Sequence, residues 1–456
     1  MRYVSTRGGT PPIGFKDAVI EGLARDGGLL LPETFPDLRG ELDALRGLPF
    51  VSLAARVMAR YIDDIPFPRL EEILRASYAG FDHPDVAPVV TFDEFSVLEL
   101  FHGPTLAFKD IALQFVGNVY AEILGERGMT LNILGATSGD TGSAAIAGVH
   151  GRPGIAIFVM YPAGRVSRLQ ELQMTSVLDD NVHALEIEGS FDDCQRLMKD
   201  VFNDLAFKSR FRLASFNSVN WARVLAQIVY YFHAALKLDQ GGRTKVSFAV
   251  PTGNFGNILS GYIARAMGAP IDRLVCATNE NDILSVLINT GVYRRGDVHY
   301  TISPSMDIQV ASNFERYVYL EMERDSARLN EFMAAFARDG VARLANGPVD
   351  PTICAGSAST AETLATIRDV YERHGYVVDP HTAVGIAVAK RLGVGSPLVC
   401  VATAHPAKFP ESVDRALGKP LAHHPRLDAL VGAKSRKRTL PATVDAVKGQ
   451  IRRYAI

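Results

Sequence analysis

The sequence has few cysteines, no long apolar run and no excess of either charge. The cysteines lie far apart and form no CxxC pair, which argues against a disulfide framework and a cysteine metal site; they are Cys194, Cys276, Cys354 and Cys400. Because 48 basic residues are matched by 50 acidic ones, with a formal net charge of −2, we expect no nucleic-acid partner and no membrane partner.

No apolar segment approaches the length of a membrane span, and residues Met1–Ser5 lack the apolar stretch of a signal peptide. We therefore expect a soluble, cytoplasmic protein. Two common phosphate-binding motifs, GxxxxGK[ST] and GxGxxG, are also absent. Any phosphate site in this chain is therefore of another kind.

The chain is long enough, at 456 residues, to form two or three domains with a large core. Residues 1–90 are predicted to form a mainly helical domain that ends near Asp82–Asp85. From residue 91 onward, strands and helices alternate, which predicts parallel α/β sheets covered by helices. We expect a smaller α/β domain at 91–210 and a larger one at 211–456 that includes a C-terminal tail.

The alternation gives these predicted strands: Leu131–Leu134, Ile155–Tyr161, His183–Ile187, Arg212–Ser215, Val246–Val250, Leu274–Thr278 and Leu398–Thr403. The predicted helices between them include Val166–Val177, Phe191–Leu205 and Trp221–Leu238. In such folds ligands bind at the loops that leave the carboxyl ends of the strands. The polar loops at these ends are therefore the candidate site.

Lys109 lies at a predicted loop-to-helix junction. Residues 97–101 predict a strand before it, and apolar residues at helical spacing predict a helix after it. Leu106, Ala107 and Phe108 surround it with apolar side chains, so burial and the positive end of the helix both lower the pKa of its amine. A free amine can form a Schiff base with an aldehyde. A lone lysine is more often a surface residue, so this hypothesis depends on the loops that follow.

The loop at 135–142, GATSGDTG, is predicted to open a helix. Its glycines allow a ligand to approach the backbone, and the free amides of the helix start attract an anion. The hydroxyls of Thr137, Ser138 and Thr141 add donors that suit a carboxylate. The alternative is a turn capped by serine and aspartate.

Two further loops have the character of anion sites. Residues 251–257, PTGNFGN, place exposed amides at a helix start and predict a phosphate cup, although a plain glycine turn is equally compatible. Asn217, Ser218 and Arg223 lie at the start of another long helix and predict a second anion site. Arg223 is alternatively an ordinary helix-surface residue.

The last candidate loop follows the apolar strand that ends near Thr403. The Thr403 hydroxyl is a neutral hydrogen-bonding partner for a ligand, or it caps the strand end. His405 and Lys408 are structural or face the pocket, and the sequence does not decide. A reactive lysine, a phosphate cup and two further anion sites suit an aldehyde cofactor with its own phosphate plus an anionic amino-acid substrate. Pyridoxal 5'-phosphate is the obvious candidate.

The order of these motifs resembles the threonine synthase family, in its longer microbial and fungal form. The resemblance runs from residues 3–8 (YVSTRG) through 108–110, 137–142, 217–220, 253–257 and 403–406, which is nearly the whole chain. It implies an α/β enzyme of fold type II, like the tryptophan synthase β-subunit, with pyridoxal 5'-phosphate as cofactor and no metal. It also implies a monomer that makes L-threonine and phosphate from O-phospho-L-homoserine and water.

The resemblance also implies a role for each motif. Lys109 binds the cofactor covalently and Thr403 contacts the pyridine nitrogen. The cofactor phosphate is held by Gly253, Asn254, Phe255, Gly256 and Asn257. Thr137, Ser138, Asp140 and Thr141 surround the substrate carboxylate and the ring edge, with Asp140 assigned to the cofactor. Asn217, Ser218 and Arg223 hold the substrate phosphate.

Two other functions fit the same residues. One is a serine/threonine dehydratase or a phospho-lyase of the same fold, which releases a 2-oxo acid and ammonia. The other is an amino-acid sensor that uses the fold without the cofactor, since a fold sets only a weak expectation of function. The products formed from the phosphorylated substrate and the absorption spectrum of the protein separate the three.

Overall fold

The computed structural model describes every residue except Ser138, Gln240, Arg243 and Ser396. Its larger sheet has six strands in the order β13-β10-β9-β14-β4-β3, all parallel except β3, which runs antiparallel to β4. The strands are β3 Val89–Thr91, β4 Ser96–Glu99, β9 Val246–Pro251, β10 Ile271–Thr278, β13 Ile353–Ser357 and β14 Leu398–Ala402.

The smaller sheet has five parallel strands in the order β15-β7-β6-β5-β8. They are β5 Leu131–Ala136, β6 Ile155–Pro162, β7 Val182–Glu188, β8 Leu213–Ala214 and β15 Arg438–Pro441. Among the described residues, two short antiparallel ribbons complete the strands: β1 Tyr3–Ser5 with β2 Leu30–Pro32, and β11 Val292–Arg294 with β12 Val341–Arg343.

The helices of the first half are α1 Phe15–Glu21, α2 Leu42–Leu45, α3 Phe50–Met58, α4 Phe67–Tyr78, α5 Lys109–Arg127, α6 Asp140–Val149, α7 Arg168–Thr175, α8 Phe191–Asn203, α9 Leu205–Arg210 and α10 Trp221–Leu238. Those of the second half are α11 Gly256–Ala266, α12 Ile283–Thr290, α13 Phe314–Glu321, α14 Ser326–Asp339, α15 Thr360–His374, α16 Pro380–Arg391, α17 Pro410–Leu417, α18 Pro425–Asp428 and α19 Val444–Tyr454. Three 3-10 turns are η1 Arg39–Glu41, η2 Pro304–Met306 and η3 Pro406–Lys408.

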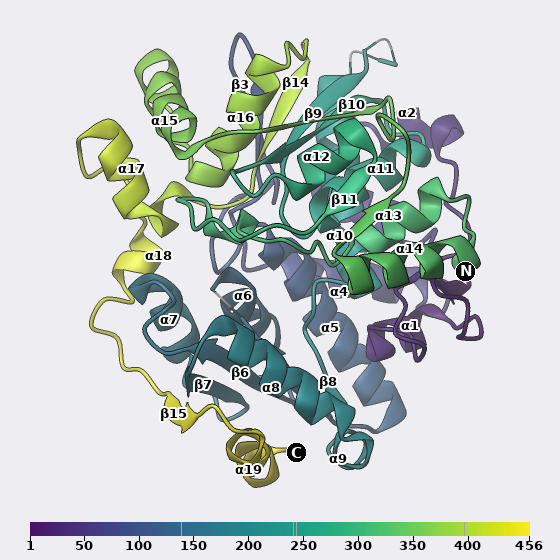
Figure 1. Ribbon diagram of the computed structural model, residues 1–456, viewed down its shortest axis with the longest axis vertical. Helices are drawn as coiled ribbons and strands as arrows, with labels where there is room; N and C mark the ends of the chain where they lie inside the picture. Colours follow the sequence, from purple (N-terminus) through teal and green to yellow (C-terminus); the bar gives the residue numbers. More distant parts are fainter. Residues whose placement is uncertain (138, 240, 243, 396) are drawn as a thin grey trace.

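The two sheets occupy opposite ends of the molecule in Figure 1, with the larger sheet at the top and the smaller one below. Helices α5 and α10 join these ends: α5 packs against α6 and α10, and α10 also packs against α3 and α11. Nearly all of α10 is buried, as expected for a helix that is apolar around most of its circumference. Its bounds match the predicted helix Trp221–Leu238.

Several local predictions are confirmed, and one is wrong. The seven strands of the alternation and the strand predicted at residues 97–101 all exist. The spacing of Ser359 and Glu362 in the sequence predicts a capping box, and the structure contains it. From the sequence, Leu53–Ile62 is predicted to be a helix with Ser52 as its N-cap, but helix α3 starts earlier, at Phe50, with Pro49 at its N-cap. A proline just before a helix fixes the backbone at its start, which outweighs the serine three positions later.

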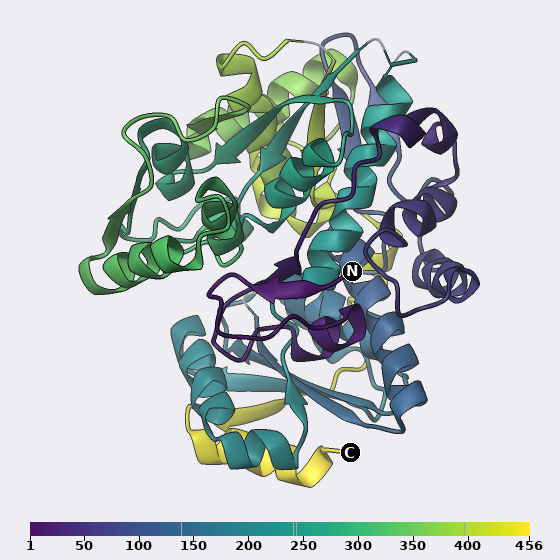
Figure 2. The ribbon, with the colours of Figure 1, turned by 90° about the vertical axis from the view of Figure 1, so that its right-hand side faces the viewer.

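The sheets do not follow the predicted domain ranges. Strand β4 belongs to the six-stranded sheet although it lies within the range 91–210, and β15 from the C-terminal tail joins the five-stranded sheet. Figure 1 shows the tail along the outside of the molecule from α17 to α19, and Figure 2 shows its end, in yellow, at the bottom of the molecule, where α19 packs against α8 and β15. A division of the chain into continuous ranges therefore does not describe these two sheets.

The N-terminal strip at residues 3–8 is tied to the large half of the molecule. Tyr3 Oη donates to Tyr61 O at 2.8 Å, and the Thr6 hydroxyl donates to Glu315 Oε1 at 2.6 Å. Arg7 adds two hydrogen bonds to the same carboxylate, at 3.2 and 3.0 Å. The strip therefore anchors β1 to α13 and lies outside the candidate site.

Candidate active site

Lys109 is the first residue of α5, at the end of a loop held against β14. The Phe108 amide donates to Thr403 O at 2.8 Å, and the His405 amide donates to Leu106 O at 3.0 Å. Leu106 adopts the left-handed conformation, with φ of 60°, where the chain turns into the helix. The two loops are therefore fixed to each other, and Lys109 and Thr403 are close neighbours.

Asp110 stabilises the loop before Lys109 through hydrogen bonds with Thr105. Its buried carboxylate accepts hydrogen bonds from the Thr105 amide and the Thr105 hydroxyl, each at 2.7 Å. A Cβ at Gly103 would lie 2.4 Å from the Asp110 Cβ, so only glycine allows this close approach. Burial raises the pKa of the Asp110 carboxyl to about 6, and the Thr105 hydrogen bonds oppose that rise.

The side-chain amine of Lys109 has a lowered pKa, which favours nucleophilic chemistry. Burial lowers its pKa to about 8; Asp140 and Asp110 act in the opposite direction, whereas Arg223 and Lys408 lower it further. About a tenth of the amine is therefore free at pH 7, far more than for an ordinary lysine, and the direction of the shift is the one expected from the sequence.

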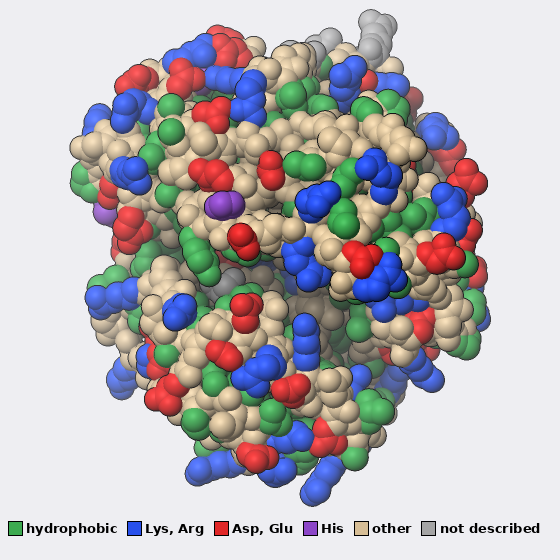
Figure 3. All heavy atoms as spheres, in the orientation of Figure 1, with side chains coloured by type: hydrophobic (Ala, Val, Ile, Leu, Met, Phe, Trp, Pro, Cys, Tyr) green, Lys and Arg blue, Asp and Glu red, His purple; other side chains and the backbone are tan. Residues whose placement is uncertain are grey.

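An open pocket of about 650 Å³ surrounds Lys109. Its lining includes these predicted site residues: Thr141, Ser218, Arg223, Gly253, Asn254, Phe255, Gly256, Asn257 and Thr403. Figure 3 shows the surface hollowed between the two ends of the molecule, with basic side chains beside the hollow. Segments from both sheets therefore meet at one cavity.

The loop between β9 and α11 has the form of an anion cup. Phe255 takes the left-handed conformation, with φ of 65°, at the N-cap of α11, and no acidic residue lies in the first turn. A Cβ at Gly253 would lie 2.6 Å from Ser305 O, so the backbone of η2 covers this glycine. The helix start therefore faces the pocket with its amide groups.

Asn257 adds an unsatisfied donor to this cup. Its Oδ1 accepts hydrogen bonds from the hydroxyls of Tyr230 (2.6 Å) and Tyr231 (2.9 Å). Its Nδ2 is buried and has no partner among the described residues. A buried amide donor without an acceptor is costly, and a phosphate oxygen in the cup would satisfy it. The residues present therefore fit a cofactor phosphate.

Arg223 is a buried cation without a carboxylate partner among the described residues. One terminal nitrogen donates to Asn217 O at 3.1 Å, while its Nε has no partner in the part of the chain that is described. Burial lowers the pKa of its guanidinium to about 10, so it remains charged at neutral pH. Such a group fits an anionic ligand in the pocket.

The other two residues of this predicted anion site differ in position. Ser218 lines the pocket, and its hydroxyl lies 2.7 Å from the Ser312 hydroxyl. Asn217 instead lines a smaller, mainly apolar cavity beside the pocket, and its Oδ1 is buried without a partner among the described residues. Its backbone carbonyl, rather than its side chain, holds Arg223.

At the start of α6, a side chain of the preceding loop already accepts hydrogen bonds from backbone amides. The Thr137 hydroxyl accepts hydrogen bonds from the amides of Gly139 and Gly142, both at 3.0 Å. Asp140 forms a buried ion pair with Lys408 at 2.9 Å. Thr141 lines the pocket, and Ser138 lies outside the described residues.

Several pocket residues were missed by the sequence analysis: Gln227, Ser305, Met306, Asn313 and His381. His381 contacts Asp379 Oδ1 through Nδ1 (2.8 Å), and its Nε2 accepts from the Ser305 amide (3.2 Å). The Asp379-Pro380 pair is a helix-start signal that points to this position. Gln227 lies four residues after Arg223 on the same face of α10, which also indicates it.

The two undecided residues of the 403–409 loop have different surroundings. His405 packs edge-on against Phe101 and His424, and burial lowers the pKa of its imidazole to about 4. Lys408 is buried in the contact with Asp140. Within the described residues there is no cluster of side chains suited to a metal ion. None of the helices in that part of the chain has the length and apolarity to span a membrane.

Three family models together match most of the chain. "Threonine synthase N terminus" matches residues 2–78, "Pyridoxal-phosphate dependent enzyme" matches residues 88–355, and "Threonine synthase, C-terminal" matches residues 382–451. The threonine synthase of Pseudomonas aeruginosa is 43% identical over 464 residues, which cover 100% of this chain and 98% of that protein.

Two solved structures are similar over their full length. A pyridoxal-phosphate-bound threonine synthase from Brucella melitensis is 45% identical, with a TM-score of 0.96 and coverage of 100% of this chain and 99% of that one. The threonine synthase of yeast is 38% identical, with a TM-score of 0.93 and coverage of 99% and 98%.

Proposed function

This chain belongs to the threonine synthase family, and from that premise we propose that it converts O-phospho-L-homoserine and water into L-threonine and phosphate. It is an enzyme that depends on pyridoxal 5'-phosphate and has the predicted fold of type II. In the net reaction the bond between the γ-carbon and the phosphate oxygen breaks. The γ-carbon gains a hydrogen, the β-carbon loses one, and the hydroxyl of water is added at the β-carbon.

Lys109 binds the cofactor covalently in this proposal, and the start of α11 holds the cofactor phosphate. The low amine pKa of Lys109 and the unsatisfied Nδ2 of Asn257 support these assignments. When bound, the cofactor withdraws electrons from the α-carbon of the substrate. Thr403 lies beside Lys109 and contacts the pyridine nitrogen; a hydroxyl brings no negative charge there.

In this proposal the Lys109 amine also holds and moves the proton of the substrate α-carbon. An amine with a pKa near 8 takes up a proton and releases it again near neutral pH. Thr141, at the start of α6, contacts the substrate carboxylate. Thr137 supports the same loop, since its hydroxyl is used by the amides of Gly139 and Gly142.

The observation that carries the choice of substrate is Arg223, a buried cation without a counter-ion among the described residues, in the pocket of Lys109. Arg223 and Ser218 hold the substrate phosphate, and Asn217 fixes Arg223 through its carbonyl. Arg223 on α10 and the start of α11 are different elements of the same pocket, so the pocket offers two anion sites.

An assay with O-phospho-L-homoserine that measures threonine and phosphate together tests the proposed function. We expect the two products in equal amounts. A 2-oxo acid and ammonia in place of threonine would instead indicate the phospho-lyase. Borohydride treatment with peptide mapping locates the cofactor: a pyridoxyl label on Lys109 supports its assignment, and a label on another lysine contradicts it.

A monomeric state and a cytoplasmic location complete the proposal. Light scattering of the purified protein tests the first, with one chain of 49.6 kDa as the expected mass. Cell fractionation with an antibody tests the second. A dimer mass or a membrane-bound fraction would contradict these two assignments without affecting the reaction.

A further inference from the structure

Lys408 is a buried cation where segments of both halves of the molecule meet. Its Nζ donates to Thr105 O (2.7 Å) and Gln173 Oε1 (3.0 Å), and it pairs with Asp140 Oδ1 (2.9 Å). Only 1% of its side chain is exposed. An ammonium group has three hydrogens to donate, so these three acceptors satisfy it.

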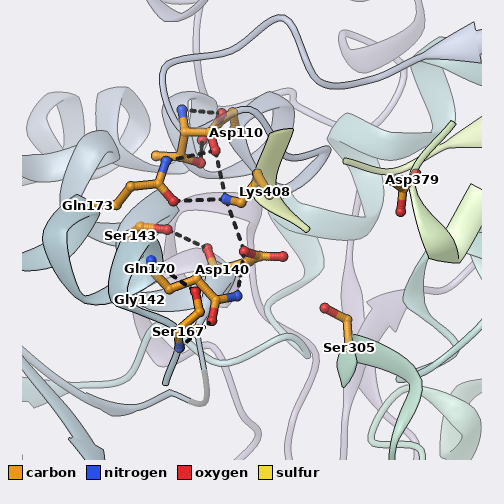
Figure 4. Close-up of polar contacts among 12 residues, drawn as sticks. Asp110, Asp140, Gly142, Ser143, Ser167, Gln170, Gln173, Ser305, Asp379 and Lys408 are labelled. Carbon is orange, nitrogen blue, oxygen red and sulfur yellow. Dashed lines mark hydrogen bonds and ion pairs between the residues drawn. The ribbon is translucent and has the colours of Figure 1, made fainter. Parts of the chain in front are cut away.

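Asp140 receives its contacts through one oxygen. Besides Lys408, Gln170 Nε2 donates to the same Oδ1 at 3.1 Å, and Gln170 is itself fixed in the capping box of α7. Figure 4 shows Lys408 between Asp110 and Asp140, with the second oxygen of Asp140 turned away from Lys408. The carboxylate is therefore held at one side by groups that do not belong to its own helix.

Lys109 lies in the same field of charges. The groups that act on it are Asp140 from α6, Asp110 from its own helix, Arg223 from α10 and Lys408 from η3. Asp110 is already engaged by the amide and hydroxyl of Thr105. Lys109 and Lys408 therefore both act on the charge of Asp140, and Lys408 is the lysine that contacts it, at 2.9 Å.

We propose that Lys408 is a positioning residue that binds Asp140 as its counter-ion and so prevents Asp140 from pairing with the ammonium form of Lys109. The amine of Lys109 thereby stays free for covalent bonding. This inference rests on the proposed covalent role of Lys109. Lys408 does not touch the reacting atoms; it acts through Asp140, and its contact with the Thr105 carbonyl fixes its own position.

The physical reason is the cost of an unpaired charge in a buried site. Burial alone would raise the pKa of the Asp140 carboxyl. Lys408 and Lys109 instead hold that pKa well below its usual value, so the buried carboxylate stays charged. Without Lys408, the lysine that still acts on Asp140 is Lys109 in its protonated form. The carboxylate then stabilises that ammonium and raises its pKa.

The experiment measures the reactivity of Lys109 directly in the full-length protein after removal of the cofactor. The protein is labelled with a trace of acetic anhydride between pH 6 and 11, and the acetylated Lys109 peptide is quantified by mass spectrometry. The variants are Lys408→Met, Asp140→Asn and the double variant, and far-UV circular dichroism verifies that each is folded. Lys448→Met is the matched control. It also removes the lysine of a lysine–aspartate ion pair, with Asp204, but Lys448 lies on α19.

We expect Lys408→Met to raise the pKa of Lys109 by at least about one unit, so that labelling at pH 7 falls about tenfold. The double variant returns this pKa to within about half a unit of wild type, because the carboxylate is gone. Lys448→Met leaves it unchanged. An unchanged pKa in folded Lys408→Met, or a double variant that stays as high as Lys408→Met, overturns the proposal.

A further arm covers the case in which Lys408→Met does not fold. Asp140→Asn retains the Lys408 cation without its carboxylate, so the pKa of Lys109 must fall below the wild-type value; no fall overturns the proposal. Failure of the proposed function is detected separately. A borohydride label on another lysine removes the covalent role of Lys109, whereas the acetylation profile still reports whether Lys408 controls its amine.

Discussion

Helices α11 and α6 both start at the pocket, but their N-termini differ in how well they are suited to bind an anion. At α11 no acidic side chain lies in the first turn, and Asn257 Nδ2 remains without a partner among the described residues. At α6 the Thr137 hydroxyl already accepts two amides, and Asp140 brings a negative charge into the first turn. A helix start binds an anion only where the chain has left its donors free.

The start of α10 is a third case. The Asn220 side chain caps it by accepting from the Ala222 amide at 3.1 Å, so this backbone donor is used. Arg223 in the first turn supplies charge in place of the free amides. The pocket therefore has two different anion sites, a backbone cup at α11 and a guanidinium at α10, which suit two phosphates held at the same time.

The largest effect is expected for Lys109→Ala, which separates the α11 cup from the covalent bond. Turnover should fall by at least about 10⁴-fold, because both the covalent link and the proton carrier are lost. The free α11 start should still hold the cofactor weakly, as equilibrium dialysis measures. Complete loss of cofactor binding would mean that the cup does not act without the lysine.

Removal of the α10 guanidinium comes next. Arg223→Ala should cost roughly 2–4 kcal/mol of transition-state stabilisation, about a 30- to 1,000-fold drop in kcat/KM for O-phospho-L-homoserine. Arg223→Lys retains the positive charge but loses the paired N–H donors of the guanidinium, so its kcat/KM should lie between those of Arg223→Ala and wild type. The cofactor spectrum should not change in either variant. A normal kcat/KM in Arg223→Ala would place the substrate phosphate elsewhere, and a lost cofactor spectrum would mean that the two anion sites are exchanged.

A smaller effect is expected when the cup itself is narrowed. In Gly253→Ala the new Cβ meets the backbone oxygen of Ser305 at 2.6 Å, which a side-chain movement does not relieve. Overpacking of this kind costs about 1–3 kcal/mol, so the Kd for the cofactor should rise about 5- to 150-fold. Gly449→Ala on α19, where a Cβ meets nothing within 4 Å, is the matched control. An unchanged Kd in Gly253→Ala would contradict the cup.

Features set by neighbouring residues were the most predictable from the sequence. The bounds of α10 follow from its apolar periodicity, and the capping box of Ser359 with Glu362 follows from their spacing. The features that were missed join distant segments. Lys408 donates to a carbonyl 303 positions earlier in the chain, and β15 pairs with β7 across a comparable separation. No local pattern encodes such contacts, because they depend on how the whole chain packs.

The smallest effect on substrate kinetics is expected for substitutions of Thr137, at the start of α6. If Thr137 serves its own loop, Thr137→Ala leaves the amides of Gly139 and Gly142 without an acceptor and should lower the free energy of unfolding by about 0.5–2 kcal/mol, as loss of a helix cap does. Thr137→Ser retains the hydroxyl and should restore most of that stability. KM for O-phospho-L-homoserine should change less than about threefold in either variant, because Thr137 supports the loop without binding the substrate. Denaturant unfolding and steady-state kinetics on the same preparations measure both quantities. A large rise in KM with unchanged stability would give the opposite result: the Thr137 hydroxyl would then bind the substrate, and the α6 start would be an anion site like that of α11.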